Sequence, residues 1–230
     1  MNRKYQEKAK LVDASKAYKP VEAFDLVKKA ATAKFTETVD VAVKLNYAPK
    51  KGDSVRSSVS LPHGSGKKVK IAVLTSPSKI KEAEEAGADV VGSEDLIEKI
   101  QGGFMDFDVL LASPDMMPKV ARLGKILGTK GLMPNPKSGT VSPEIGKTVK
   151  EFKAGKVEFR MDAGGVIHLV LGKVDFDSKK LADNLKTVLE TIRKVKPSSI
   201  KGSLVKSITV SSSMGPGVKI DHREFTEILQ

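Results

Sequence analysis

The sequence predicts two domains, an α/β domain inserted into an α+β domain that is built from both ends of the chain. Three observations predict this: apolar runs alternate with helical patterns in the middle, polar and apolar residues alternate in the flanking strands, and positive charge gathers in the flanks. Residues 68–158 carry 14 basic and 13 acidic side chains, whereas residues 1–67 carry 14 and 7 and residues 159–230 carry 12 and 8. The middle is therefore nearly neutral, and both flanks are basic.

The first flank predicts one helix and two strands. Residues 20–35 have apolar side chains at helical spacing, and residues 38–47 alternate apolar with polar residues, as in a half-buried strand. Residues 48–54 are turn-forming, and residues 55–62 have the pattern of a second strand. The residues expected to face the core are Val21, Phe24, Val27, Ala31, Val39, Val41, Val43, Leu45, Val55, Val59 and Leu61. These elements are too few to close a core alone.

The middle of the chain predicts parallel strands covered on both faces. Short apolar runs at residues 69–75, 88–92 and 107–113 are typical of such strands. Helical patterns separate or follow them at residues 77–87, 93–103 and 115–128, with Gly87 expected as a C-cap and Ser93 as an N-cap. The alternation favours a Rossmann-like α/β domain over residues 67–156, leaving residues 1–66 and 157–230 as one discontinuous α+β domain.

The second flank predicts strands and a long helix. Residues 156–162 alternate as a strand, and residues 164–174 are expected to be its hairpin partner across Asp162–Gly165. Leu181, Leu185, Val188, Ile192 and Val195 have helical spacing within residues 181–195. In residues 203–220, Ser207, Thr209, Ser211 and Ser213 fall on one strand face and Ile208 and Val210 on the other.

Composition excludes several function classes. The chain has no cysteine, which excludes disulfides, thiolate metal sites and cysteine nucleophiles. His63, His168 and His222 lack the spacing of a zinc site, and no triad of catalytic side chains is evident, so we predict no metal, cofactor or catalytic residue. No apolar run has the length of a membrane span, and we expect a soluble, cytoplasmic protein.

The run Gly64-Ser65-Gly66-Lys67 resembles the end of a phosphate-binding loop but fails its spacing. Such a loop requires glycine where Leu61 stands, a hydroxyl where Lys68 stands, and a helix afterwards. The run lies where the basic flank gives way to the neutral middle, so we expect a hinge with Gly64, Gly66 and Gly155 at the two crossings. The remaining enzyme alternative is a Rossmann-like nucleotide-binding enzyme, which rests on fold class alone.

The net charge of +12 favours a polyanionic partner. Hydroxyls on residues 207–213 can contact phosphates and ribose 2′-OH groups, although such a face is also typical of a solvated sheet. Only six of the 40 basic residues are arginine, which suits phosphate neutralisation better than bidentate base reading. Lys125, Lys130 and Lys137 lie in a segment rich in glycine and proline, which is either a phosphate contact or a stiff connector.

Four stretches together resemble the bacterial large-subunit ribosomal protein L1 family, whose members lie at the mobile stalk: "KFTETVDVAVKL", "LPHGSGKK", "GTKGLMPNPKSGTV" and "SSMGPGVKI". The resemblance runs from about residue 5 to residue 219, and the tail from residue 221 has no counterpart. It implies a two-domain, non-enzymatic protein that binds rRNA beside the tRNA exit site and assists release of deacylated tRNA. It also implies repression of translation through the protein's own operon mRNA.

The resemblance also implies which residues contact RNA. They are Lys34, Phe35, Thr38, Ser207, Ser213, Met214 and Gly215, joined by Arg160 and His168 from the expected hairpin. Ser213 stands where many relatives have threonine, and it keeps the hydroxyl. The partners implied are large-subunit rRNA, operon mRNA and tRNA, with no membrane and no cofactor. We expect the free protein to be a monomer and the bound protein to be part of the cytoplasmic ribosome.

Overall fold

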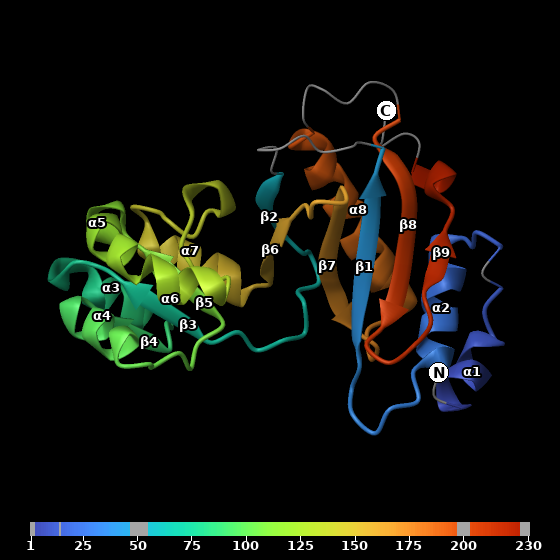
Figure 1. Cartoon of the computed structure of the whole chain (residues 1–230), viewed down its shortest axis with the longest axis horizontal. Helices are drawn as coiled ribbons and strands as arrows, with labels where there is room; N and C mark the ends of the chain where they lie inside the picture. Colours follow the sequence, from blue (N-terminus) through green and yellow to red (C-terminus); the bar gives the residue numbers. More distant parts are fainter. Residues whose placement is uncertain (1–2, 14, 47–54, 197–202, 226–230) are drawn as a thin grey trace. The chain divides into compact units, whose positions relative to one another are not determined.

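The computed structural model describes residues 3–13, 15–46, 55–196 and 203–225, and the chain divides into two compact units of mixed α and β structure (Figure 1). Unit 1 comprises residues 1–67 and 157–230, and unit 2 comprises residues 68–156. The loop expected over residues 48–54 lies outside the described residues.

The elements of unit 1 come from both flanks of the sequence. They are α1 (Arg3–Ala9), α2 (Pro20–Ala30), β1 (Thr38–Leu45), β2 (Arg56–Ser60), β6 (Lys156–Arg160), β7 (Val166–Lys173), α8 (Ser178–Lys194), β8 (Val205–Ser212), β9 (Val218–Ile220) and the 3₁₀ helix η5 (His222–Phe225). β6 begins at the last residue of unit 2.

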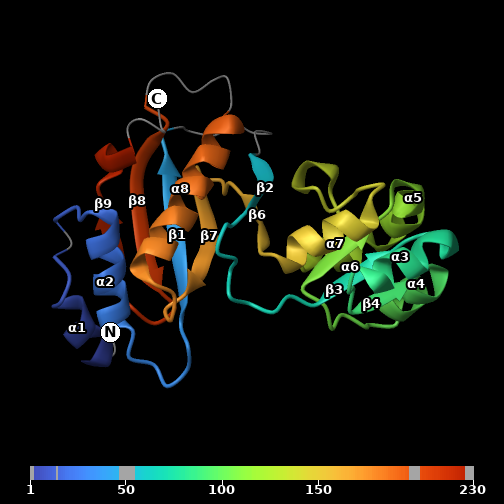
Figure 2. The same cartoon turned by 180° about the vertical axis from the view of Figure 1, so that it is seen from behind.

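An antiparallel sheet with the order β7-β1-β8-β9 is the centre of unit 1. Helices α2 and α8 cover one of its faces, which lies toward the viewer in Figure 2, and none of the described helices lies on the opposite face. β1 alternates half-buried and buried residues along its whole length, as its sequence predicts. This one-sided cover is what an antiparallel sheet with alternating residues permits.

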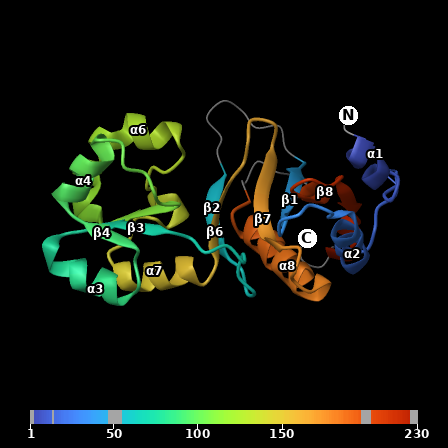
Figure 3. The same ribbon diagram turned by 90° about the horizontal axis from the view of Figure 1, so that it is seen from below.

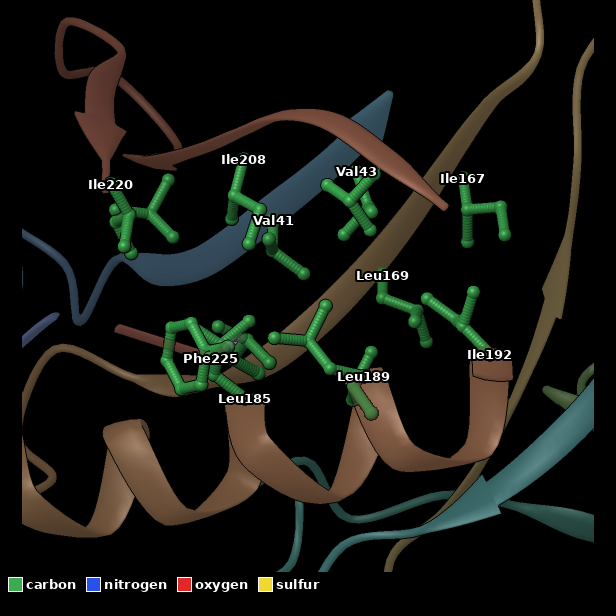
Figure 4. Close-up of a cluster of buried hydrophobic side chains, with 14 of the residues drawn as sticks. Val41, Val43, Ile167, Leu169, Leu185, Leu189, Ile192, Ile208, Ile220 and Phe225 are labelled. Atoms are coloured by element: carbon green, nitrogen blue, oxygen red, sulfur yellow. The ribbon is translucent and has the colours of Figure 1, made fainter. Parts of the chain in front are cut away.

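The core of unit 1 lies between this sheet and α8 (Figure 4). Val41 and Val43 of β1 face Leu185 and Leu189 of α8, and all four are almost fully buried. The helical spacing of residues 181–195 is confirmed, although α8 begins earlier, at Ser178. Phe225 of η5, in the tail that lacks a family counterpart, also packs into this core.

Helix α2 differs from its prediction at both ends. Val21 is 41% exposed because the buried stripe runs through Ala23, Phe24, Val27 and Ala30, and Val21 lies beside that stripe. The helix ends at Ala30 because Ala31 has extended backbone angles, so Ala31 is not part of its buried face. The prediction that Val21 and Ala31 face the core is therefore wrong.

The expected hairpin between residues 156–162 and 164–174 is also wrong. β6 pairs with β2 in a separate two-stranded sheet, and β7 pairs with β1. One bridge, Met161 to Ile167, joins the two segments, beside a hydrogen bond from the Asp162 N–H to the Val166 carbonyl. β1 offers β7 a longer ladder and a shared apolar face, and this outweighs closeness in sequence.

Unit 2 is built on a parallel sheet with the order β4-β3-β5. Its elements are β3 (Ile71–Leu74), η1 (Pro77–Lys79), α3 (Ile80–Glu85), β4 (Val90–Gly92), α4 (Glu94–Gln101), β5 (Val109–Ala112), η2 (Pro114–Met116), α5 (Met117–Val120), η3 (Ala121–Leu123), α6 (Gly124–Thr129), η4 (Pro136–Ser138) and α7 (Ile145–Lys153). All four residues of β3 are buried, because α3 and α7 cover one face of the sheet and α4 and α6 the other (Figure 3).

Three local predictions in unit 2 have different outcomes. Gly87 follows the last turn of α3 with φ of 90°, as a C-cap glycine should. Ser93 precedes α4, but its side chain makes no capping bond; Asp95 Oδ1 instead accepts the Ser93 N–H at 2.9 Å. The helix expected over residues 115–128 is broken into α-helical and 3₁₀ turns, because Pro118 and Gly124 interrupt it.

Candidate nucleic-acid interface

The helix-free face of the unit 1 sheet, which we call the open face, is lined mainly by polar side chains. Cross-strand register brings Asp40 opposite Ser211, Lys44 opposite Ser207, and Ala42 between His168 and Thr209. The open face comprises the outward residues Asp40, Ala42, Lys44, Val166, His168, Val170, Ser207, Thr209, Ser211 and Lys219. Ser207, Thr209 and Ser211 are half-exposed while Ile208 and Val210 are buried, as the alternation in the sequence predicts.

Two connecting segments meet where β1 begins and β8 ends. We call residues 31–37 the Phe35 loop and residues 213–215 the Met214 turn. The Thr38 N–H donates to Ser213 Oγ at 3.1 Å, and the Ser213 N–H donates to the Thr38 carbonyl at 3.0 Å, so the pairing of β1 and β8 continues beyond the strands. Phe35 and Met214 are large apolar side chains that remain 58% and 59% exposed. The fold thereby brings two sequence-predicted contact segments to one place.

A hollow of about 610 Å³ lies between these segments and α1. Its lining combines aromatic and apolar side chains with two ammonium groups: Tyr5, Lys8, Thr32, Ala33, Lys34, Phe35, Ser213 and Met214. Lys8 Nζ donates to the Met214 carbonyl at 3.4 Å. Such a surface can contact the flat face of a nucleobase and a neighbouring phosphate.

Glu37 is a functional candidate that sequence reasoning missed. Its side chain is buried, with 1% exposure, and it accepts one N–H from each connecting segment: Ala33 at 3.0 Å and Met214 at 2.9 Å. Burial acts to raise the pKa of this carboxyl, but the hydrogen bonds, led by that from Met214, and the charge of Lys8 outweigh it and hold the pKa below its usual range. The available signal was an acidic residue in a basic segment just before a strand.

Gly215 is required by close approach rather than by backbone angle. A Cβ at this position would lie 2.4 Å from Ser212 Oγ, so the buried Ser212 side chain would have to move. The Gly215 N–H donates to the Ser212 carbonyl at 3.1 Å and closes the turn. The sequence-predicted residue Gly215 thus holds the Met214 turn tight.

His168 lies on β7, the edge strand separated from β8 by β1, and Arg160 lies on β6, in the separate two-stranded sheet. They flank the single bridge between Met161 and Ile167, and both are exposed. His168 Nε2 is 3.7 Å from Asp162 Oδ2. Hydrogen bonds from the Val166 and Gly164 N–H groups lower the pKa of that aspartate. Because β1 separates β7 from β8, the structure does not place Arg160 and His168 beside the last serine-rich strand, as the hairpin prediction assumed.

The glycine run before unit 2 is anchored on unit 1. The buried Asn184 side chain accepts the His63 N–H at 3.2 Å and donates to the Gly64 carbonyl at 3.1 Å. Gly66 has φ of 69°, and a Cβ there would lie 2.9 Å from Lys173 Cγ. The chain then enters strand β3, so the run is not followed by a helix, as a phosphate-binding loop requires. Gly155, at the other crossing, has φ of 110° directly after α7.

Several charged side chains of unit 2 have structural partners or lie in an ordered connector. Asp106 pairs with Lys70 at 2.7 Å, and Asp108 Oδ2 accepts the Lys70 N–H at 3.1 Å. Lys130 and Lys137 are exposed, and the segment between them is ordered by Asn135, whose Oδ1 accepts the Lys137 N–H at 2.8 Å. That geometry accounts for a stiff connector and leaves the lysines accessible.

Two further observations concern the described part of the chain. No group of three or more histidine or carboxylate side chains there is placed to hold a metal ion. Among the described helices, none combines the length and apolar character that crossing a membrane requires.

Comparison with protein families identifies the family of the chain. The model of the family described as "Ribosomal protein L1p/L10e family" matches residues 27–216. The match covers well over half of the chain and includes the Phe35 loop, the whole of unit 2 and the Met214 turn. It leaves out Tyr5 and Lys8 in α1, which line the hollow, and η5, which completes the core.

Proposed function

The chain belongs to the ribosomal protein L1p/L10e family, a family of ribosomal proteins rather than enzymes, and we propose that it binds large-subunit rRNA through unit 1. The proposed contact comprises the Phe35 loop, the Met214 turn and the open face. Its residues are Lys34, Phe35, Thr38, Ser207, Ser213, Met214 and Gly215, with His168 at its margin and Arg160 beside it.

The observation that supports this proposal most is the exposed pair Phe35 and Met214. Large apolar side chains that stay more than half exposed mark an interaction surface when they adjoin polar and cationic groups. Here they adjoin Lys34 and the hydroxyl of Ser213, which accepts the Thr38 N–H. Apolar faces suit bases, ammonium groups suit phosphates, and hydroxyls suit ribose 2′-OH groups, so the combination fits RNA.

We extend the proposal to the setting that the family resemblance implies. The protein would lie at the mobile stalk beside the tRNA exit site, assist release of deacylated tRNA, and repress its own operon by binding the mRNA at the same surface. The support is the family match, which includes residues from both segments of unit 1. We propose that the protein is monomeric before it joins the cytoplasmic ribosome.

We also propose a hinge at the two crossings between the units, close to Gly64, Gly66 and Gly155. All three have positive φ, which marks places where the chain changes direction. Because Asn184 ties Gly64 to unit 1 and Gly66 packs on Lys173, any bending at the first crossing begins after Gly66. Nothing comparable supports the nucleotide-binding alternative for unit 2.

The test is substitution of Met214 by aspartate. A carboxylate at this exposed position repels the phosphate backbone, so affinity for purified large-subunit rRNA should fall by about 10- to 100-fold in a filter-binding titration. The matched control is Val21→Asp, an equally drastic change at an exposed residue of α2 on the helix-covered side of the sheet. Unchanged affinity of Met214→Asp, with the fold intact by circular dichroism, would refute the site.

A further inference from the structure

Glu37 is an unexpected residue type at its position. It is a buried carboxylate bonded to both segments of a surface that we assign to a polyanion. Burying a carboxylate is costly unless its oxygens are hydrogen-bonded, and negative charge weakens the attraction for phosphates. On both counts a neutral residue would be the simpler choice, so the carboxylate must supply something else.

The hydrogen bonds of Glu37 show what it supplies. Oε1 accepts the Ala33 N–H at 3.0 Å, and Oε2 accepts the Met214 N–H at 2.9 Å. Ala33 belongs to the Phe35 loop and Met214 to the Met214 turn, and both residues line the hollow. One rigid carboxylate therefore joins two walls of the hollow that are far apart in the sequence.

Glu37 is itself fixed in place by its backbone and by a nearby cation. Its carbonyl accepts the Val174 N–H at 3.0 Å, which attaches it to the end of β7. Lys8 of α1 is buried close by, lowers the pKa of the carboxyl by its charge, and donates to the Met214 carbonyl. The carboxylate thus stays ionised, with both oxygens available as acceptors, and its position relative to the sheet is set.

We propose that Glu37 is a positioning residue for RNA binding: it fixes the separation of the Phe35 loop and the Met214 turn, and with it the width of the hollow between them. The proposal rests on the proposed RNA-binding function. Glu37 touches no RNA in this role. Its effect on affinity is exerted through Phe35 and Met214, which it holds at a fixed spacing.

Charge and position predict opposite results when the carboxylate is neutralised. If Glu37 acted only as a negative charge, Glu37→Gln would raise affinity for RNA. If it acts by position, Glu37→Gln lowers affinity, because an amide presents one acceptor oxygen to two N–H donors. Glu37→Ala, which removes both acceptors, should lower it further, by about tenfold or more.

The experiment compares full-length wild type, Glu37→Gln, Glu37→Ala and Glu22→Gln in filter-binding titrations with purified large-subunit rRNA at several salt concentrations. Glu22 is an exposed acid on α2, and its neutralisation should leave affinity unchanged or slightly raised. The Glu37 variants should bind more weakly with an unchanged salt dependence, because no phosphate contact is lost. Wild-type affinity in both Glu37 variants would overturn the proposal. Absence of rRNA binding by the wild type would instead overturn the proposed function, and the positioning role with it.

A second measurement uses the wild type alone, in case the variants do not fold. Amide chemical shifts of Ala33 and Met214 should change together in an NMR titration toward low pH, with one midpoint below the ordinary value of 4.5, as the shared acceptor is protonated. Lys8 is the charged group that faces the carboxyl. Amides that titrate separately, or not at all, would contradict the proposal.

Discussion

The two units use their sheets in opposite ways. The antiparallel sheet of unit 1 has helices on one face and a polar face without them, whereas the parallel sheet of unit 2 is covered on both faces. Consequently β1 alternates buried with half-buried residues and β3 is buried throughout. A covered sheet leaves only loops and helix surfaces for contact, whereas the sheet of unit 1 is itself a presentable surface.

The lysines of the two units also differ, in the kind of oxygen that they contact. In unit 2, several ammonium groups pair with carboxylates: Lys70 with Asp106, Lys119 with Glu94, Lys153 with Asp89 and Lys156 with Glu151. In unit 1, several donate to uncharged oxygens: Lys8 to Met214, Lys28 to Phe176, Lys44 to Gly164 and Lys173 to Thr38. These hydrogen bonds hold the four lysines in place, although Lys8 and Lys173 also act on the nearby carboxylates of Glu37 and Asp40. Several of the lysines that contribute the excess charge of the flanks are therefore held in fixed positions.

The largest expected effect is a loss of stability that is confined to the core of unit 2. Leu111 of β5 is fully buried in unit 2, and Leu111→Ala should cost about 2–5 kcal/mol of that unit's stability through the cavity it leaves. Differential scanning calorimetry should show an earlier transition for unit 2. Affinity for rRNA, measured below that transition, should stay at the wild-type value. A parallel loss of affinity would show that the units do not act separately.

A smaller effect distinguishes the lysines. Lys34→Ala removes an exposed charge from the hollow, so the slope of log affinity against log salt should decrease by about 1. Lys153→Ala, in unit 2, removes a charge already compensated by Asp89 at 3.7 Å, and its slope should match that of the wild type. Equal slopes for the two variants would remove the distinction between the lysines of the two units.

The smallest effect concerns Asp40, an acidic residue on the open face. Burial raises the pKa of its carboxyl, against the opposing charges of Lys173 and His168, so the ionised form opposes folding above the ordinary value of 3.8. Asp40→Asn should therefore raise the melting temperature slightly at pH 7. The gain should shrink as pH falls and disappear below 3.8, where the wild-type carboxyl is protonated in both states. A gain independent of pH would contradict this account.

Periodicity predicts the elements of this chain better than their partners. The sequence predicts the alternation in β1 and β8 and the helical spacing in α8. It does so because one buried face gives apolar residues a period of two in a strand and of about 3.6 in a helix. The pairing of β7 with β1 does not, since sequence proximity favours a hairpin and only the packed sheet reveals the better ladder. The breaks at Pro118 and Gly124 could have been inferred from helix propensity.

The candidate site likewise contains residues that the sequence predicts and residues whose role depends on tertiary contacts. The segments containing Phe35 and Met214 stand out in the sequence, and the fold brings them together. Glu37 does not stand out, because its importance comes from two hydrogen bonds to backbone groups of different segments. Tyr5 and Lys8 escape notice for a similar reason: they reach the hollow from α1 only through tertiary packing.

The strand order of unit 1 has a consequence for how the protein is made. β1 pairs with β7 and β8, which leave the translating ribosome about 120 and 160 residues later, or about 6 to 32 seconds at ordinary rates of synthesis. Unit 2 is continuous in sequence and is complete before either partner emerges. The apolar residues of β1 therefore have no strand partner until β7 and β8 are synthesised. The Met214 turn can meet the Phe35 loop only after β8 has been added to the sheet. In a nascent chain, unit 2 is therefore complete before the proposed RNA-binding surface of unit 1 can be assembled.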